Sequence, residues 1–244
     1  MRLRMTVAYD GTQFSGWQSQ AHGKAVQDAL ESAFRLLCGG RVVVHGSGRT
    51  DAGVHAEGQS AHVDVPDDRL PVGEWLAAVN ANIPPGVRVM SLRKAAPDFH
   101  ARFSARGKIY RYSIWNGPVM PPLLINRAWH VPGQPDPDLL KAACASLTGR
   151  HDFAAFCARG SKAPEPTTRT LSAIRLSRKG PAWTLTFQGD GFLYKMVRML
   201  AASAVRCAIG RFPLDELRRR LKDAGPRTSH VAPAGGLCLV RVLY

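Results

Sequence analysis

The apolar residues of this 244-residue chain follow two spacings, and the two spacings recur in a similar order in both halves. Residues 2–10 alternate apolar and polar side chains, which is typical of a half-buried strand. Residues 25–37 instead repeat apolar side chains at helical intervals, and the Gly39-Gly40 pair that follows predicts the end of a helix. A chain with both periods in each half is expected to be neither all-helical nor all-strand, so the pattern predicts an α+β fold.

The same interpretation extends along the chain. In the first half it predicts a helix near 70–81 and strands near 41–45, 59–65 and 87–95. In the second half it predicts strands near 107–116, 169–177, 182–189 and 237–243, and helices near 137–147, 192–209 and 213–223. We therefore expect two α+β domains, residues 1–104 and 105–244. Asp136 and Pro137 fit the cap and first turn of the helix that starts there.

The charge is strongly positive and unevenly distributed. The chain has a formal net charge of +15. Residues 1–104 hold 11 basic and 10 acidic side chains, a balance of +1, so the remaining +14 lies in residues 105–244. Such a distribution favours a polyanionic partner that the C-terminal half binds, and nucleic acid fits better than a membrane surface. A solvated basic surface with no partner is the alternative.

Cysteine usage and hydropathy bear on the class of protein. Five cysteines form no C-x-x-C pair, which disfavours both a disulfide framework and a zinc site and fits a reducing compartment. No apolar run approaches the ~18 residues of a membrane span, and the N-terminus begins with a strand pattern rather than a signal peptide. We expect a cytoplasmic protein without a metal or cofactor. His55 and His62 have no spacing typical of metal ligands.

Residues 46–56 carry the chemistry and read Gly-Ser-Gly-Arg-Thr-Asp-Ala-Gly-Val-His-Ala. The valines at 42–44 precede them, so Asp51, the only acid in the run, is expected on a tight loop that leaves a strand. Three interpretations are open: a glycine turn with a solvated acid, a dinucleotide site, and a catalytic aspartate. The dinucleotide site is disfavoured because its third glycine would fall at Asp51, where a carboxylate would face a pyrophosphate.

The segment GRTDAGVHA at 48–56 resembles the catalytic loop of the tRNA pseudouridine synthase A family. Other motifs agree with the family in order and spacing: Tyr9-Asp10-Gly11, Gly16-Trp17-Gln18, residues 79–84, 99–105 and 110–112, Met196-Val197-Arg198 and residues 236–240. The chain departs from the family pattern at Ser19, Met199 and Ala202. The resemblance implies two ferredoxin-like halves with joined antiparallel sheets, a central cleft that holds the active site, and a homodimer.

The resemblance also implies roles for single residues. Asp51 would be the catalytic nucleophile or base, and Arg198 would be its ion-pair partner. Tyr110 would stack on the target base and could take the C5 proton. Arg49 would fill the gap that a flipped base leaves, and Leu237 would pack against the uracil. Taken without the resemblance, Tyr110 is more typical of a strand residue that packs on the core, and Arg198 of a solvated helix face. A core leucine is the alternative for Leu237.

The implied reaction is the isomerisation of uridine to pseudouridine at positions 38, 39 and 40 of the tRNA anticodon stem-loop. It needs no electron carrier because reactant and product are isomers. The alternatives are the same chemistry on another structured RNA, or a non-catalytic RNA-binding protein. Residues 158–170 lack apolar periodicity and are expected to form a loop that offers Arg159, Lys162 and Arg169 to phosphates.

Overall fold

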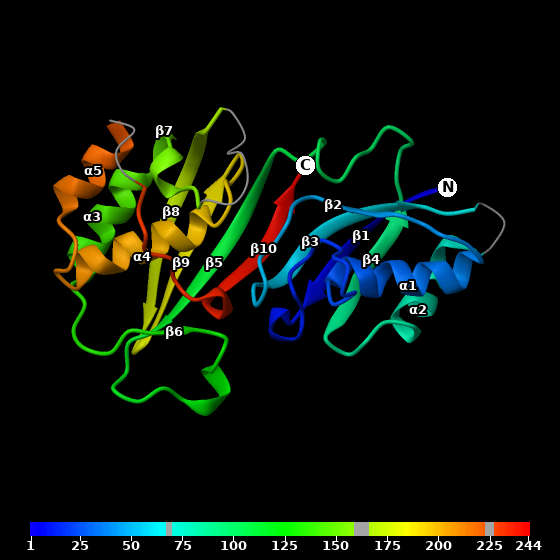
Figure 1. The fold of residues 1–244 in the computed structure, drawn as a ribbon, viewed down its shortest axis with the longest axis horizontal. Helices are drawn as coiled ribbons and strands as arrows, with labels where there is room; N and C mark the ends of the chain where they lie inside the picture. Colours follow the sequence, from blue (N-terminus) through cyan, green and yellow to red (C-terminus); the bar gives the residue numbers. More distant parts are fainter. Residues whose placement is uncertain (67–69, 159–165, 223–226) are drawn as a thin grey trace. The chain divides into compact units, whose positions relative to one another are not determined.

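The computed structural model describes residues 1–66, 70–158, 166–222 and 227–244, and the chain forms two compact units (Figure 1). The first unit comprises Met1–Arg106 together with Cys238–Tyr244, and the second comprises Gly107–Leu237. The division lies close to the expected boundary at residue 104. However, the last strand belongs to the N-terminal unit, so that unit is built from both ends of the chain.

The N-terminal unit has the β-α-β-β-α-β order of a ferredoxin-like fold. Its elements are β1 (Arg2–Tyr9), α1 (Val26–Cys38), β2 (Val44–Gly46), β3 (His55–Asp64), α2 (Val72–Ala81) and β4 (Val87–Lys94), with β10 (Leu237–Leu243) added at the end. The strands β4, β1, β3 and β2 neighbour one another in that order, and all three pairings are antiparallel. β10 pairs with β3 in parallel, through residues 238–239 and 55–56. The 3-10 turn η1 (Gly11–Gln13) follows β1.

The apolar periods of the sequence explain which faces are buried. Alternate residues of β1 are buried, and they form the core with the apolar stripe of α1. Figure 1 shows α1 and α2 on the same face of this sheet. Gly39 ends α1 in the left-handed conformation (φ +70°), as the Gly39-Gly40 pair predicts.

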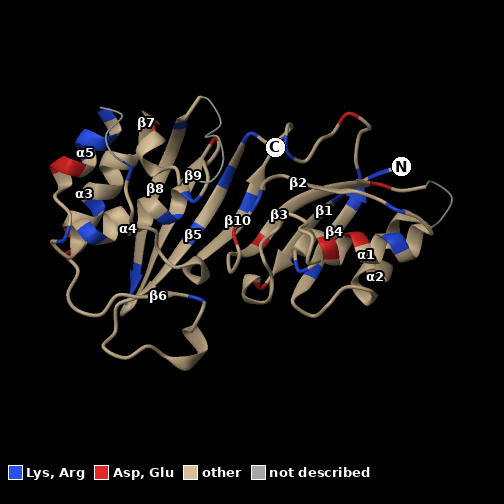
Figure 2. Cartoon of the chain, viewed as in Figure 1, with Lys and Arg blue, Asp and Glu red and all other residues tan. Residues whose placement is uncertain are grey.

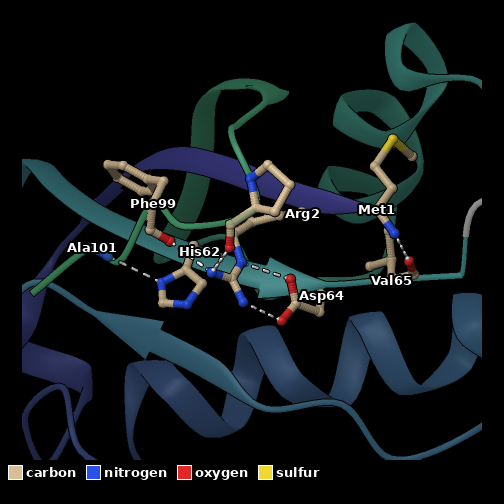
Figure 3. Close-up of polar contacts among 8 residues, drawn as sticks. Met1, Arg2, His62, Asp64, Val65, Phe99 and Ala101 are labelled. Carbon is tan, nitrogen blue, oxygen red and sulfur yellow. Dashed lines mark hydrogen bonds and ion pairs between the residues drawn. The ribbon is translucent and has the colours of Figure 1, made fainter. Parts of the chain in front are cut away.

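Residues 97–101 are tied to this sheet by a set of polar contacts (Figure 3). Arg2 makes two hydrogen bonds to the carboxylate of Asp64 and also donates to the carbonyl oxygens of Pro97 and Phe99. His62 Nδ1 accepts from the backbone N–H of Ala101, at 3.2 Å. Burial is the main reason that the pKa of His62 is lowered to about 4. The segment that leads to the second unit is therefore anchored to the first.

The C-terminal unit follows a β-α-β-β-α order once two short strands, one on each side of its first helix, and its last helix are left out. Its elements are β5 (Gly107–Trp115), η2 (Pro122–Leu124), β6 (Trp129–His130), α3 (Pro137–Leu147), β7 (Gly149–Asp152), η3 (Ala154–Phe156), β8 (Thr168–Lys179), β9 (Ala182–Gly189), α4 (Met196–Ala208), α5 (Leu214–Lys222) and η4 (Ala234–Gly236). The antiparallel strands β5, β9, β8 and β7 neighbour one another in that order, and β6 pairs with β5 in parallel. α3 contacts α4, α5 and β8.

The mixed fold with mostly antiparallel sheets confirms the predicted α+β class. The expected joining of the two sheets and the cleft between the halves concern the relation of the units to each other, and both stay predictions. The Asp136 carboxylate caps α3 by accepting from the backbone N–H groups of Asp138 and Leu139, as predicted. The short strands β6 and β7 were not predicted, because two to four residues show no measurable period.

Several boundaries differ from the sequence prediction. β2 covers Val44–Gly46 rather than 41–45, and β3 begins at His55 rather than near 59. α4 begins at Met196 rather than near 192, because Lys195 adopts a left-handed conformation (φ +57°) that an α-helix does not contain. β8 begins at Thr168, so Arg169 lies in a strand and not in the predicted loop. Arg159 and Lys162, the other two basic residues of that loop, lie outside the described residues.

The positive charge of the C-terminal unit is spread over several elements. Figure 2 shows basic residues on its helices as well as on its strands, including β5, β8 and α5. α5 alone carries Arg218, Arg219, Arg220 and Lys222. Among the described residues, no helix has both the length and the apolar character needed to cross a membrane.

Candidate active site

Asp51 lies on the loop that joins β2 to β3, as the sequence predicts. Its side chain is half-buried, and its backbone carbonyl accepts from the N–H of Val54, at 3.1 Å. Gly53 within this turn has a φ of +78°, a left-handed conformation that glycine adopts without strain. The loop therefore turns tightly directly after Asp51, and the polypeptide enters β3 four residues later.

The opening segment of the chain holds this loop from one side. The hydroxyl groups of Tyr9 and Thr50 lie 2.8 Å apart in the buried interior. The carbonyl of Thr50 accepts from the backbone N–H of Trp17, at 3.1 Å. The residue directly before Asp51 is thus fixed through both its side chain and its backbone. Two motifs that are far apart from the loop in the sequence, residues 9–11 and 16–18, hold it in place.

Two glycines let this opening segment approach closely. A Cβ atom at Gly11 would lie 2.5 Å from the carbonyl carbon of Val54, and one at Gly16 would lie 2.5 Å from the carbonyl oxygen of Thr50. Real Cβ atoms essentially never come that close to other heavy atoms. Gly16 also has a φ of +95°. Both positions therefore exclude a side chain for steric reasons.

Further hydrogen bonds fix the two ends of the loop. Gln59 Nε2 donates to the carbonyl of Gly48 at 2.8 Å, and Ser47 N donates to the carbonyl of Ser60 at 2.8 Å. His55 Nδ1 accepts from the backbone N–H of Gly11, at 3.1 Å. His55 therefore braces the loop against the opening segment. The carboxylate of Asp51 is presented on a scaffold with few degrees of freedom.

Arg49 lies two residues before Asp51 on the same loop, with its side chain exposed. Its Nε donates to Gln18 Oε1, at 3.1 Å. Gln18 in turn donates from Nε2 to Gln27 Oε1 at 2.7 Å, and Gln27 lies on α1. Gln18 belongs to a motif that is visible in the sequence, but its contact with Arg49 is evident only from the tertiary structure.

Tyr110 lies on β5 in the C-terminal unit and is buried, with 7% of its surface exposed. Its ring meets the ring of Phe192 edge to face, with 5.0 Å between the centroids. Tyr112, two residues on, is fully buried, and its hydroxyl donates to the carbonyl of Pro233 at 2.8 Å. Burial raises the pKa of Tyr112, which keeps its hydroxyl protonated. The two tyrosines therefore have different surroundings.

Arg198 is the third residue of α4 and is half-buried. Its Nε donates to the carbonyl of Ala232 at 2.8 Å, and its own carbonyl accepts from the N–H of Ala232. Residues 232–236 continue past the Tyr112 ring to Leu237, which is 6% exposed. The C-terminal unit thus brings Arg198, Tyr112 and the segment before Leu237 into one neighbourhood.

The predicted site residues therefore fall into two groups. Asp51 and Arg49 share one loop of the N-terminal unit, whereas Tyr110, Arg198 and Leu237 belong to the C-terminal unit. The roles given to all five residues, and the ion pair between Asp51 and Arg198, stay predictions. Within the described parts of the chain, no group of three or more His, Cys, Asp or Glu side chains is placed to hold a metal ion.

Comparisons with known proteins agree with the motif resemblance. A family model described as tRNA pseudouridine synthase matches residues 5–104 and 143–244. Curated relatives named tRNA pseudouridine synthase A include one from Akkermansia muciniphila, 44% identical over 251 residues, which aligns with 100% of this chain and 95% of its own length. Another, from Solidesulfovibrio magneticus, is 43% identical over 257 residues, with 100% and 91% covered.

A more distant relative of the same name, from a Geobacter species, is 36% identical over 99% of this chain and 98% of its own length. Among solved structures, a chain of a Cbf5–Nop10–Gar1 complex matches 82% of this chain and 40% of its own length, with 12% identity and a TM-score of 0.35. That likeness is too low to support an argument. Because the family model spans most of the chain and two relatives exceed 40% identity over all of it, the chain belongs to the tRNA pseudouridine synthase family of isomerases.

Proposed function

We propose that this protein isomerises uridine to pseudouridine at positions 38, 39 and 40 of the tRNA anticodon stem-loop, with Asp51 as the catalytic residue. The single observation that carries the proposal is the bracing of the Asp51 loop by residues 9–17 and by His55 and Gln59. A solvated surface acid needs no such scaffold. We further propose that the enzyme works in the cytoplasm as a homodimer and without a cofactor.

The chemistry begins with base flipping. The N1–C1′ bond of a uridine must break, and the base must rejoin the sugar through C5. The base cannot turn in this way inside a stacked helix. The target nucleotide therefore leaves the stack, at a cost of a few kcal/mol. The Asp51 carboxylate then acts as a nucleophile or a base. Attack at C1′, attack at C6 and removal of the 2′-proton are all open to a carboxylate in this position. No redox step is needed, because the product is an isomer of the substrate.

The other four residues support this step in the proposal. Arg198 forms the ion pair that keeps Asp51 ionised against the desolvation of a closed site. Tyr110 stacks on the flipped base, a contact worth roughly 1–3 kcal/mol, and can accept the C5 proton through its hydroxyl. Leu237 packs against the uracil. Arg49 occupies the space that the flipped base leaves in the RNA.

The basic C-terminal unit supplies the attraction for RNA in this proposal. The balance of +12 in residues 107–237, which hold 20 basic and 8 acidic side chains, and the spread of basic residues over β5, β8 and α5 support that role. The N-terminal unit has a balance of only +3, from 13 basic and 10 acidic side chains, and contributes the catalytic loop. A non-catalytic RNA-binding protein would gain nothing from a carboxylate on a braced loop, because an acid facing phosphates weakens binding.

The test uses an unmodified tRNA transcript and maps pseudouridines after incubation with the protein. We expect modification at 38, 39 and 40, and transcripts with cytidine at one of these positions should lose that product alone. Modification only elsewhere would contradict the assigned substrate. A complete lack of pseudouridine would contradict the assigned activity.

The role of Asp51 is tested by Asp51→Asn. We expect no detectable isomerisation and a Kd for tRNA equal to or lower than that of the wild type, because removal of a negative charge does not weaken phosphate contacts. Glu74→Gln, which removes one exposed carboxylate from α2 of the same unit, is the matched control and should keep full activity. Turnover by Asp51→Asn near the wild-type rate would exclude Asp51 as the catalytic residue.

A further inference from the structure

We propose that Gln18 is a positioning residue for Arg49, and that a relay of hydrogen bonds from Glu31 through Gln27 and Gln18 orients the arginine. The proposal rests on the role of Arg49 in the proposed function. Gln18 itself need not touch RNA, since it acts through the guanidinium that it holds.

The relay consists of three consecutive side-chain hydrogen bonds. Arg49 Nε donates to Gln18 Oε1 at 3.1 Å, Gln18 Nε2 donates to Gln27 Oε1 at 2.7 Å, and Gln27 Nε2 donates to Glu31 Oε1 at 2.8 Å. These distances lie within the ordinary range for hydrogen bonds. The four side chains come from three separate segments of the N-terminal unit and form one continuous path.

The chemistry of its two ends gives the relay a single direction. An ionised Glu31 can only accept, so Gln27 must turn its amide nitrogen toward it and its amide oxygen toward Gln18. Gln18 must then present its own nitrogen to Gln27, which leaves its oxygen for Arg49. Arg49 can only donate, so the last bond is satisfied as well. Reversal of either amide would place two donors or two acceptors face to face.

Backbone groups hold the Gln27 amide and the Glu31 carboxylate in this arrangement. Gln27 Oε1 also accepts from the N–H of Ser19 at 2.9 Å, and Glu31 Oε1 also accepts from the N–H of Val44 at 3.0 Å. Gln27 is only 8% exposed and lies in α1, and its N–H donates to the carbonyl of Trp17 at 3.0 Å. The relay is therefore anchored to α1 and β2, the two elements that precede the catalytic loop.

An exposed arginine without such a partner populates many rotamers. The entropy lost when it is ordered then counts against RNA binding or against the transition state. A hydrogen bond at Nε restricts the plane of the guanidinium in the free enzyme. Part of the side-chain entropy of the arginine is therefore already lost when the protein folds, and less is lost when RNA binds. Nη1 and Nη2 are the nitrogens that act on the RNA once the base has left the stack.

The test compares variants along the relay in single-turnover assays with saturating enzyme. Gln18→Ala should lower the rate of pseudouridine formation by about five- to twentyfold, the range expected when one exposed hydrogen bond to a charged group is removed. The Kd for tRNA should change by less than about twofold, and a transcript with a mismatched target uridine, which flips at lower cost, should restore part of the rate. A merely structural role would lower thermal stability and would not respond to the mismatch.

Two variants of Glu31 form a matched pair. Glu31→Gln keeps Oε1, the atom that accepts from both Gln27 and Val44, and should stay within about twofold of the wild-type rate. Glu31→Lys removes the acceptor and presents a donor to the Gln27 amide, so it should reduce the rate as Gln18→Ala does. Equal activity of the two Glu31 variants would overturn the relay.

A double-mutant cycle separates this proposal from the proposed function. In the Arg49→Ala background, Gln18→Ala should cause no further loss, because its effect acts only through Arg49. Additive losses in the double mutant, or a wild-type rate for Gln18→Ala alone, would overturn the positioning role of Gln18. The proposed function would still stand in that case, provided that the native protein forms pseudouridine. If Arg49→Ala itself kept the wild-type rate, the positioning role would fall with it. Absence of pseudouridine from the native protein would instead reject the proposed function.

Discussion

The close approach of Gly11 to the Asp51 loop makes Gly11→Ala a sharp test of how the loop is held. A Cβ atom at this position would lie 2.5 Å from Val54 C and 2.9 Å from Gly53 C, and closer still to the carbonyl oxygen of Val54. All three are backbone atoms and cannot rotate away. To reach the 3.4 Å of an ordinary contact with all three atoms, the two backbones must separate by more than 1 Å.

This displacement affects both stability and catalysis. Overpacking costs about 1–3 kcal/mol, and the lower entropy of the unfolded alanine chain offsets about 0.4–1 kcal/mol of it. A net loss of about 1–2 kcal/mol lowers the Tm of a chain of this size by about 2–8 °C. Val54 N donates to the carbonyl of Asp51, so the shift reaches the residue that we propose as catalytic. A displacement of about 1 Å can lower the rate by about 100-fold.

The assay measures the single-turnover rate of pseudouridine formation and the thermal unfolding of the same preparation. Gly73→Ala is the control, because a Cβ atom at this position in α2 meets nothing within 4 Å. The control should keep the wild-type rate, and its Tm should stay equal or rise slightly. A Gly11→Ala protein with both wild-type Tm and wild-type rate would refute the steric argument. A lowered Tm with an unchanged rate would show that the position of Val54 does not control Asp51.

Three further predictions concern other parts of the chain. Tyr9→Phe removes the hydroxyl that meets Thr50 Oγ1 and should lower the free energy of unfolding in guanidinium by about 0.5–1.5 kcal/mol, with kcat reduced more than KM. The free energy of unfolding should fall as the pH decreases from about 6.5 to about 4. In this range the unfolded chain protonates His62 at its ordinary pKa of 6.5, whereas burial lowers the pKa of His62 in the folded protein to about 4. Denaturation curves of His62→Gln across this range should show a smaller fall. Replacement of Arg159, Lys162 and Arg169 by glutamine should make log K for tRNA binding less dependent on log salt. The slope should decrease by about 0.7–0.9 for each phosphate that the variant no longer neutralises. An unchanged slope would mean that these three residues do not bind RNA.

Local patterns in the sequence were sufficient for most of the secondary structure. The helix over residues 26–38, the cap at Asp136 and the strand 182–189 were all predictable, because each depends on a side-chain period or a capping residue within its own segment. The position of Asp51 on a loop between two strands was predictable for the same reason. The family was recognisable from motifs, and the comparisons confirm it.

Contacts between distant segments could not be predicted in this way. The addition of β10 to the N-terminal unit joins residues 238–239 to residues 55–56, and no period within either segment indicates that pairing. The left-handed conformation of Lys195, which precedes α4, is one that residues other than glycine rarely adopt, so no local preference indicates it.

The arrangement around the candidate site shows the same division. The sequence by itself determined the residue types: glycines at 11 and 16, an acid at 51 and two glutamines at 18 and 27. Only the tertiary structure decided that Gly11 and Gly16 lie against the loop backbone and that the two glutamines connect Glu31 to Arg49. The physical reason is that steric exclusion and hydrogen bonding act between atoms a few ångströms apart, whatever their separation along the chain.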